Sequence, residues 1–431
     1  MSIKIRSFNL LFSIVLIIGF IGVVQAQYDD IIYNEDEVPD YNLPDPLVLS
    51  NGKKVDSKRV WHEKRRTEIV NLFENQVYGE APEEDVEVKY EVKSIAKDHF
   101  GGNATRKIVS VYIIHGDQIQ EVTLMIYIPN HVEDPAPVFL GSNYLGNQST
   151  TYDPTLPLPN GWVKSGEQYP TKDHRATEES RGAKDYRWPF KMIVARGYAI
   201  ATVCYGDFAP DTPEEYKAGI YSLFSQEDNT SSEWGAIAIW AYGLQKMLDY
   251  FEKDNQIDHK RVAVFGQSRR GKAALWAGAL DQRFAMVYSN CSGCGGAALS
   301  RRHFGETLKI INHQFPHWFC DRFKKYNDNE SDLPVDQHML LSLIAPRPLY
   351  VASATKDLWA DPRGEFLSAK HAEPVYNLFD KEGLKVAEMP EPNQSVGARI
   401  GYHIREGGHD ITPFDWHLVL NFADKHLKPK K

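Results

Sequence analysis

The sequence has little cysteine, with only four in 431 residues. The nearest pair is Cys291 and Cys294, and no second pair of this kind accompanies it. A structural zinc site needs four protein ligands, so we expect no metal. A chain of this length can bury a large core and does not depend on disulfides, even in an oxidising compartment. We therefore expect the cysteines to be buried free thiols.

Positive charge is also in deficit, since 49 Lys and Arg stand against 58 Asp and Glu, for a formal net charge of -9. Proteins that bind nucleic acids carry a clustered positive surface, and nothing in this balance supports such a partner. An excess of acidic residues mainly favours solubility. The chain also contains no internal repeat and no low-complexity tract.

The one long apolar run lies at the N-terminus, from Leu10 to Val24. Lys4 and Arg6 precede it, and Val24-Gln25-Ala26 ends it with small residues at the two positions that a signal peptidase reads. We predict a signal peptide over residues 1–26 that is cleaved after Ala26, and a secreted or periplasmic product with no membrane contact. An uncleaved membrane anchor is the alternative, although the run is short for a bilayer span.

Beyond this segment, short apolar strands alternate with amphipathic helices. Strands are predicted over 86–95, 104–128, 138–141, 198–205, 262–265, 348–353 and 401–405, and helices over 60–77, 233–251 and 272–277. This alternation indicates a mostly parallel, doubly wound sheet. We predict one domain over 27–431. It would begin with an extended acidic lead-in, the segment from residue 27 to about residue 45, and contain a long polar insert around 148–188. The insert is interpreted as a wall of a cleft, with a disordered insert as the alternative.

The most informative stretch is Arg261 to Leu280, RVAVFGQSRRGKAALWAGAL. An apolar strand runs into a tight turn that carries Ser268, and a helix of small and apolar residues follows. An α/β-hydrolase presents its nucleophile on such a turn, and the helix N-terminus offers N–H groups to an oxyanion. The G-x-S-x-G pattern is half met, because Arg270 stands where the second glycine belongs. An ordinary strand-to-helix turn is the alternative.

The partners that a serine nucleophile needs are present in the order nucleophile, acid, histidine. Asp357 follows the strand at 348–353, and His409 follows the strand at 401–405 and two glycines. A serine requires a general base, and a carboxylate fixes the tautomer of the imidazole. Asp361 and Glu365 remain alternatives for the acid, and His409 could be a loop histidine that bonds only locally. Residues 142–147 are expected to form the second oxyanion loop, or else an ordinary polar loop.

The turn GQSRRGK resembles the G-x-S-R-x-G-K signature of the glucuronoyl esterases, carbohydrate esterase family 15. The segments SGCGGA at 292–297, APR at 345–347 and GGH at 407–409 are similar to further motifs of that family. The resemblance extends from about residue 137 to the C-terminus. The stretch ATKDLWADPRGEF and the long polar insert are most similar to the bacterial branch.

The resemblance implies an α/β-hydrolase fold, a three-layer αβα sandwich, and a monomeric serine esterase without a cofactor. Its substrates would be esters between (4-O-methyl-)D-glucuronoyl groups of glucuronoxylan and lignin alcohols. Ser268 would be the nucleophile, His409 the base, and Arg269 an oxyanion ligand. Three further residues would contact the sugar: Lys272, Glu306 and Trp359. The alternatives are a solvated face for Arg269 and Lys272, and core packing for Trp359.

The sequence departs from the family at two sites. Many members carry a catalytic Glu where this chain has Asn290-Cys291, whereas some bacterial members place the acid at the position of Asp357. Fungal members have a disulfide at the positions of Gln267 and Asp410, which is absent here. Arg270 matches no role in the family, and we expect a surface or ion-paired residue. Another carbohydrate esterase, such as an acetyl-xylan esterase, and a catalytically weak carbohydrate-binding relative remain alternatives.

Overall fold

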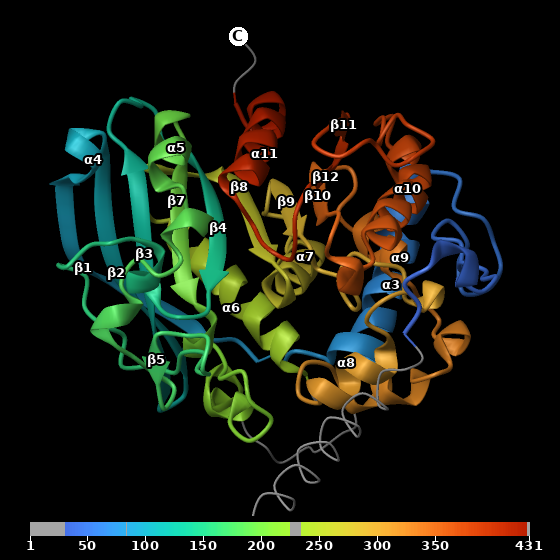
Figure 1. Cartoon of the computed structure of the whole chain (residues 1–431), viewed down its shortest axis with the longest axis horizontal. Coiled ribbons are helices and arrows are strands. Elements are labelled where there is room, and N and C mark those ends of the chain that lie inside the picture. Colours follow the sequence, from blue (N-terminus) through green and yellow to red (C-terminus); the bar gives the residue numbers. More distant parts are fainter. Residues whose placement is uncertain (1–30, 83, 225–233, 429–431) are drawn as a thin grey trace, which may run out of the picture.

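The computed structural model describes residues 31–82, 84–224 and 234–428. The predicted signal peptide over 1–26, with its cleavage site after Ala26, lies outside the described residues. No helix in the described ranges is long and apolar enough to cross a membrane. The acidic lead-in runs along the C-terminal half of the protein, where Ile32 forms a β-bridge with Phe304 and Glu35 pairs with Arg302 (Figure 1).

A ten-stranded sheet forms the centre of the protein, in the order β1-β2-β3-β7-β4-β8-β9-β10-β12-β11 (Figure 1). The strands span β1 Glu87–Asp98, β2 Ala104–His115, β3 Gln118–Pro129, β4 Ala136–Asn143, β7 Ala199–Cys204, β8 Ile257–Gln267, β9 Met286–Asn290, β10 Leu349–Ala354, β11 Ser395–Gly397 and β12 Ile400–Arg405. Neighbours from β7 to β12 along this order run parallel, while β1, β2, β3 and β11 add antiparallel edges. A short separate hairpin, β5 Thr171–Lys172 with β6 Arg175–Ala176, lies in the polar insert.

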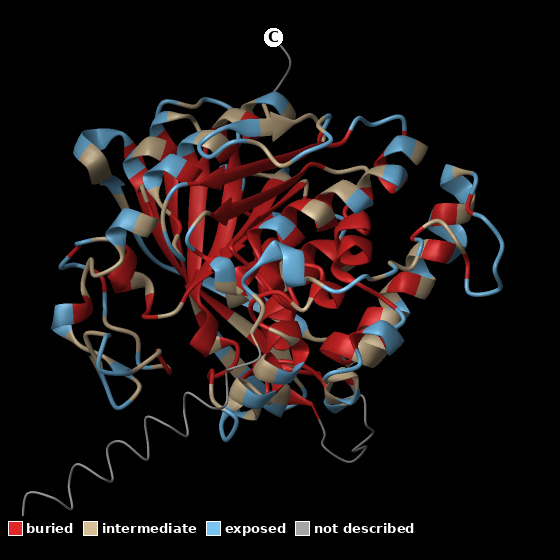
Figure 2. Ribbon diagram, turned by 45° about the vertical axis from the view of Figure 1, so that its right-hand side comes forward, coloured by how far each residue is buried: buried red, intermediate tan, exposed pale blue. Residues whose placement is uncertain are grey.

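Successive residues of the central strands face two different cores, as expected of a sheet covered on both faces. In β8, Val262 and Val264 belong to one core, and Ala263 and Phe265 belong to the other. Helices α3 Arg66–Phe73, α6 Ala236–Phe251, α7 Arg269–Leu280, α9 Gln337–Ser342 and α10 Pro362–Leu378 cover the first face. Helices α5 Phe190–Ala195 and α11 Pro413–His426 cover the second. Figure 2 shows the buried sheet between these layers, which is the predicted αβα sandwich.

Several elements differ from the prediction in number or length. The segment 104–128 is not continuous, because a turn at 116–117 folds β3 back onto β2 with His115 opposite Gln118. Strand β9 was not predicted, since five residues are too few to show a clear period. The predicted helix at 60–77 is α2 Lys58–Val60 and α3 joined by a π-helical turn at Trp61–Arg65, with a second π-helical turn at Glu74–Tyr78. The described ranges also contain the short α-helices α4 His99–Gly102 and α8 Leu308–Gln314.

Candidate active site

Ser268 lies between β8 and α7 with a φ of 62° and a ψ of -133°. A positive φ is rare for a non-glycine residue and requires that the surroundings hold the backbone in place. Two contacts do so, because the amide of Ser268 donates to the carbonyl of Asn290 at 2.9 Å and its carbonyl accepts from the amide of Gly271 at 2.8 Å. The side chain is thus presented at the carboxyl edge of the parallel strands, as in a nucleophile elbow.

The two glycines around the serine are required by close contacts. A Cβ on Gly266 would lie 2.1 Å from the carbonyl oxygen of Arg270. A Cβ on Gly271 would lie 3.0 Å from both the Oγ of Ser289 and the Cβ of Ser292. Gly271 therefore lets α7 approach the segment that follows β9, which explains why the second glycine of this turn comes one residue later than in the general pattern.

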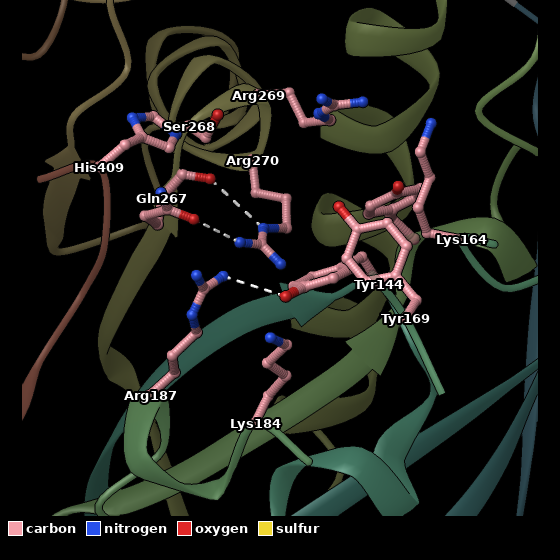
Figure 3. A pocket seen from close by; sticks show the side chains of 11 residues that line it. Tyr144, Lys164, Tyr169, Lys184, Arg187, Gln267, Ser268, Arg269, Arg270 and His409 are labelled. Carbon is pink, nitrogen blue, oxygen red and sulfur yellow. Dashed lines mark hydrogen bonds between the residues drawn. The ribbon is translucent and has the colours of Figure 1, made fainter. Parts of the chain in front are cut away.

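His409 and Asp357 come together because β10 and β12 are parallel neighbours whose loops leave the same edge of the sheet. The Nδ1 of His409 lies 2.6 Å from Oδ2 of Asp357. Asp357 is buried, whereas the side chain of His409 is 43 % exposed. Ser268 and His409 line the same cavity, and Figure 3 shows their side chains next to one another. With Nδ1 bonded to the carboxylate, Nε2 is the nitrogen available to the serine.

The two alternative carboxylates have other partners within the described part of the chain. Asp361 caps α10 through the amide of Gly364 at 2.9 Å and pairs with the Nε of Arg302 at 2.8 Å. Glu365 accepts from the amides of Ser292 and Gly293 at 2.7 and 3.0 Å. Both carboxylates thus act as structural groups that fix the loops beside the candidate triad.

Cys291 lies at the position where the resemblance noted above would place a catalytic acid. Its Sγ and ligand atoms of Asp357 and His409 all lie within 4.8 Å of one another. Burial raises the pKa of this thiol well above its usual value, with the nearby Asp357 adding to the effect. A neutral thiol cannot stabilise an imidazolium as a carboxylate does, and Asp357 is the carboxylate in contact with His409. All four cysteines lie in the described residues and are free and buried.

Glu365 generates a prediction about stability. Burial raises its pKa to about 8, and its Oε2 lies 2.6 Å from the Oγ of Ser353. In the unfolded chain the pKa of a Glu is about 4.3. At a pH between about 4.3 and about 8, Glu365 is therefore ionised in the unfolded chain and protonated in the folded protein. The contribution of Glu365 to the free energy of unfolding is therefore fully present below the pKa of the unfolded chain. It is lost as the pH rises toward the pKa of the folded protein, by up to about 1.4 kcal/mol per pH unit.

We expect Glu365→Gln to remove this slope, since the amide preserves the hydrogen bonds of the neutral acid. Urea unfolding at about pH 5, 6.5 and 8 measures the difference, which should grow with pH in favour of the variant. Glu63→Gln, at a side chain 52 % exposed, is the matched control and should keep the wild-type slope. Parallel pH profiles for wild type and Glu365→Gln would show that Glu365 ionises normally.

Arg269 is held in place by a buried carboxylate that the sequence did not indicate. Its guanidinium lies over the rings of Trp318 and Phe315, 4.4 and 5.0 Å from their centroids, and pairs with Asp211. Asp211 also accepts from the Nε1 of Trp318 at 2.8 Å and contacts the Nε2 of His317 at 3.0 Å. These partners outweigh burial and hold the pKa of Asp211 well below its usual range. The one sequence feature that could have drawn attention to Asp211 is its place shortly after β7, since Asp357 likewise follows β10.

The three predicted sugar contacts lie close together. The buried Lys272 donates from Nζ to the carbonyl of Ser292, and its charge acts on the buried carboxyl of Glu306. Burial raises the pKa of Glu306, while Lys272 and a hydrogen bond with Trp359 oppose that rise. The ring of Trp359 is only partly buried, so core packing does not account for it. An ammonium and a carboxyl group beside a partly exposed indole are suited to a sugar with several hydroxyl groups.

A cavity of about 190 Å³ opens beside Ser268 and His409 (Figure 3). The polar insert and the loop after β4 supply part of its lining, namely Tyr144, Lys164, Tyr169, Lys184 and Arg187. In the loop at 142–147, Tyr144 thus lines the cavity, while the amide of Gly146 donates to the side chain of Asn143 at 2.8 Å.

Arg270 also lines the cavity, and the expectation of a surface or ion-paired residue was wrong. The side chain is buried, donates hydrogen bonds to Gln267 and lies over the ring of Tyr144. Arg270 lies in the first turn of α7 and faces the cavity that Lys184 and Arg187 of the insert also line. The residues around the serine in the sequence do not show that Arg270 will be buried by segments distant in the chain.

Polar contacts connect Gln267 and Asp410, the positions at which the resemblance would place the fungal disulfide. Gln267 accepts from Arg270 at 2.7 Å, and Arg270 lies over the ring of Tyr144. The hydroxyl of Tyr144 accepts from Arg187 at 3.2 Å, and Arg187 pairs with Asp410 at 2.7 Å. A chain of hydrogen bonds and cation–π contacts thus joins the serine turn to the histidine loop.

The sheet order, the serine turn and the His409–Asp357 pair define an α/β-hydrolase. A family model described as fungal glucuronyl esterase matches residues 186–380. The carbohydrate esterase MZ0003 of an unknown prokaryotic organism is 46% identical over 407 residues, which are 94% of each chain. A 4-O-methyl-glucuronoyl methylesterase of Schizophyllum commune is 26% identical over 84% of this chain and 80% of its own.

Solved structures agree with this relationship. A promiscuous family 15 esterase from a marine bacterial metagenome superimposes with a TM-score of 0.87 at 46% identity, over 92% of this chain and 100% of the other. A glucuronoyl esterase from Solibacter usitatus gives 0.85 at 44% identity, over 91% and 100%. The chain therefore belongs to carbohydrate esterase family 15, the glucuronoyl esterases, and is a carboxylic ester hydrolase. The predicted fold and the resemblance to bacterial members are confirmed.

Proposed function

We propose that this protein hydrolyses esters between (4-O-methyl-)D-glucuronoyl groups of glucuronoxylan and lignin alcohols, with Ser268 as its nucleophile. The observation that carries the proposal is the 2.6 Å contact of His409 with Asp357 beside a serine held at positive φ. The neighbouring Lys272, Glu306 and Trp359 offer a site for the uronoyl ring. Membership of a family whose curated relatives bear the name glucuronoyl methylesterase supports this substrate class.

The reaction follows from the geometry. His409 takes the proton of Ser268 through Nε2 while Oγ attacks the uronoyl carbonyl, and Asp357 stabilises the resulting imidazolium. The tetrahedral intermediate collapses, the alcohol leaves with the proton from His409, and an acyl-enzyme remains. Water activated by His409 then releases the uronic acid. Every step uses side chains of this chain, and we propose no metal or organic cofactor.

The oxyanion would be stabilised from α7. The backbone N–H of Arg269 follows the nucleophile and lies at the N-terminus of the helix, where it points toward developing charge. The guanidinium of Arg269 adds a cationic donor that Asp211, Trp318 and Phe315 hold in place. Preorganisation of this kind matters, since losing one oxyanion donor costs about 100- to 1,000-fold in rate.

We also propose that the protein is exported before it acts, because its polymeric substrate lies outside the cell. The support is the predicted signal peptide over residues 1–26, with its positive start, apolar run and small residues before Gln27.

The direct test is hydrolysis of benzyl D-glucuronate by the wild type and by Ser268→Ala. We expect loss of the nucleophile to lower kcat by about 10⁶-fold and to abolish covalent labelling by a fluorophosphonate. Acetylated xylan, assayed in parallel, identifies an acetyl-xylan esterase if it is the better substrate. Equal rates for the two proteins would contradict the assignment of Ser268, and retained xylan binding without labelling of the wild type would indicate a carbohydrate-binding relative.

The assignment of Asp357 as the acid of the triad can be tested by substitution. We expect Asp357→Ala to lower kcat on the benzyl ester by about 10³- to 10⁴-fold, because the imidazole loses its orienting carboxylate. Asp361→Asn is the control, since asparagine also caps helices and Asp361 contacts Arg302 rather than His409. Kinetics and circular dichroism on both variants separate catalysis from folding. Greater loss of kcat in a folded Asp361→Asn would overturn the choice of Asp357.

A further inference from the structure

The cavity beside Ser268 lies on the alcohol side of the ester, if the proposed function holds. It is lined by Ser268 and His409 and includes none of Lys272, Glu306 and Trp359. The uronoyl group would bind at those three residues, and the leaving alcohol must collect its proton from His409. The part of the substrate that enters the cavity is therefore the alcohol.

The lining of this cavity is strongly cationic and contains no carboxylate. Its charged side chains are Lys164, Lys184, Arg187, Arg269 and Arg270. The buried Asp211 neutralises part of this charge through Lys164 and Arg269, and Asp410 pairs with Arg187. Within the described part of the chain, no carboxylate forms an ion pair with Lys184 or Arg270. The cavity thus keeps an excess of positive charge in an acidic protein.

Arg270 is the most unusual of these groups, because it is only 7% exposed. Burial lowers its pKa to about 10, with Arg187 and Arg269 adding to the effect, so the guanidinium is still charged at neutral pH. A buried charge without a counterion is costly unless another group compensates it. Gln267 and the ring of Tyr144 supply dipoles and a π-face but no negative charge.

We propose that this cavity binds a carboxylate carried by the alcohol component of the ester. Figure 3 shows the side chains of Arg270, Arg187 and Lys184 converging around Tyr144. Guanidinium groups match the planar geometry of a carboxylate, and an ammonium adds a point charge. The rings of Tyr144 and Tyr169, 5.7 Å apart between centroids, form an aromatic wall. The favoured substrates are uronoyl esters of arylalkyl alcohols that bear a carboxylate.

The test compares three uronoyl esters that differ only in the para substituent of the alcohol: benzyl, 4-carboxybenzyl and 4-carbamoylbenzyl. We expect kcat/KM for the carboxylate to exceed that of its neutral carbamoyl isostere by about 10-fold or more, the scale of a charge-assisted hydrogen bond. The gain should lie mainly in KM. It should also shrink in about 0.5 M NaCl, because the cavity is open to solvent.

Substitutions test whether the preference for the carboxylate ester arises in the cavity. Lys184→Gln and Arg270→Gln should each bring the ratio between carboxylate and carbamoyl esters toward one. Lys172→Gln makes the same charge change in the same insert but outside the cavity lining, and it should keep the wild-type ratio. Lys184 is only partly buried, so its variant tests the proposal even if Arg270→Gln does not fold.

The outcomes separate this proposal from the proposed function. Equal kcat/KM for the two esters in the wild type, with clear hydrolysis of the benzyl ester, would overturn the carboxylate site alone. A preference that persists in a folded Lys184→Gln and Arg270→Gln would also overturn it. Failure to hydrolyse any uronoyl ester would overturn both proposals.

Discussion

The backbone of Ser268 is held at a positive φ by its contacts with the end of β9 and the first turn of α7, and the rest of the site is arranged around that turn. Because Gly266 and Gly271 permit these contacts, the serine stands at the edge where β8, β9, β10 and β12 all end. The loops after β10 and β12 then bring Asp357 and His409 to the same place. Strain at one residue is thus maintained by the packing of four parallel strands.

Arg269 and Arg270 follow the serine directly, and α7 sends their side chains into different surroundings. Arg269 pairs with the buried Asp211 and lies over Trp318, and these contacts hold its guanidinium in place next to Ser268 in the sequence. Arg270 turns beneath the insert and meets Tyr144 without a carboxylate partner. In the function we propose, the motif would serve two parts of the cleft, one for the acyl group and its oxyanion and the other for the alcohol.

The sequence was sufficient to predict the parallel sheet, the serine turn and the loops that carry Asp357 and His409, because each depends on a local pattern next to an apolar strand. It could not decide between Asp357, Asp361 and Glu365, since that depends on how α10 begins and on the partner Arg302. Asp211 was missed because its contacts with Arg269, His317 and Trp318 join residues 58 or more positions apart along the chain. Arg270 was expected at the surface or in an ion pair, because its burial against Tyr144 joins segments far apart in the sequence. Each of these differences between the predicted and the observed site depends on contacts between residues far apart in the sequence.

A crystal structure of Ser268→Ala with bound D-glucuronate tests the central claim, a cleft with an acyl side and an alcohol side. We predict that the sugar ring contacts Lys272, Glu306 and Trp359 and that the carboxyl carbon lies next to position 268 beside Arg269. The cavity around Tyr144, Lys184 and Arg270 should stay clear of the sugar. A sugar ring bound in that cavity, with Lys272, Glu306 and Trp359 uncontacted, would contradict the account.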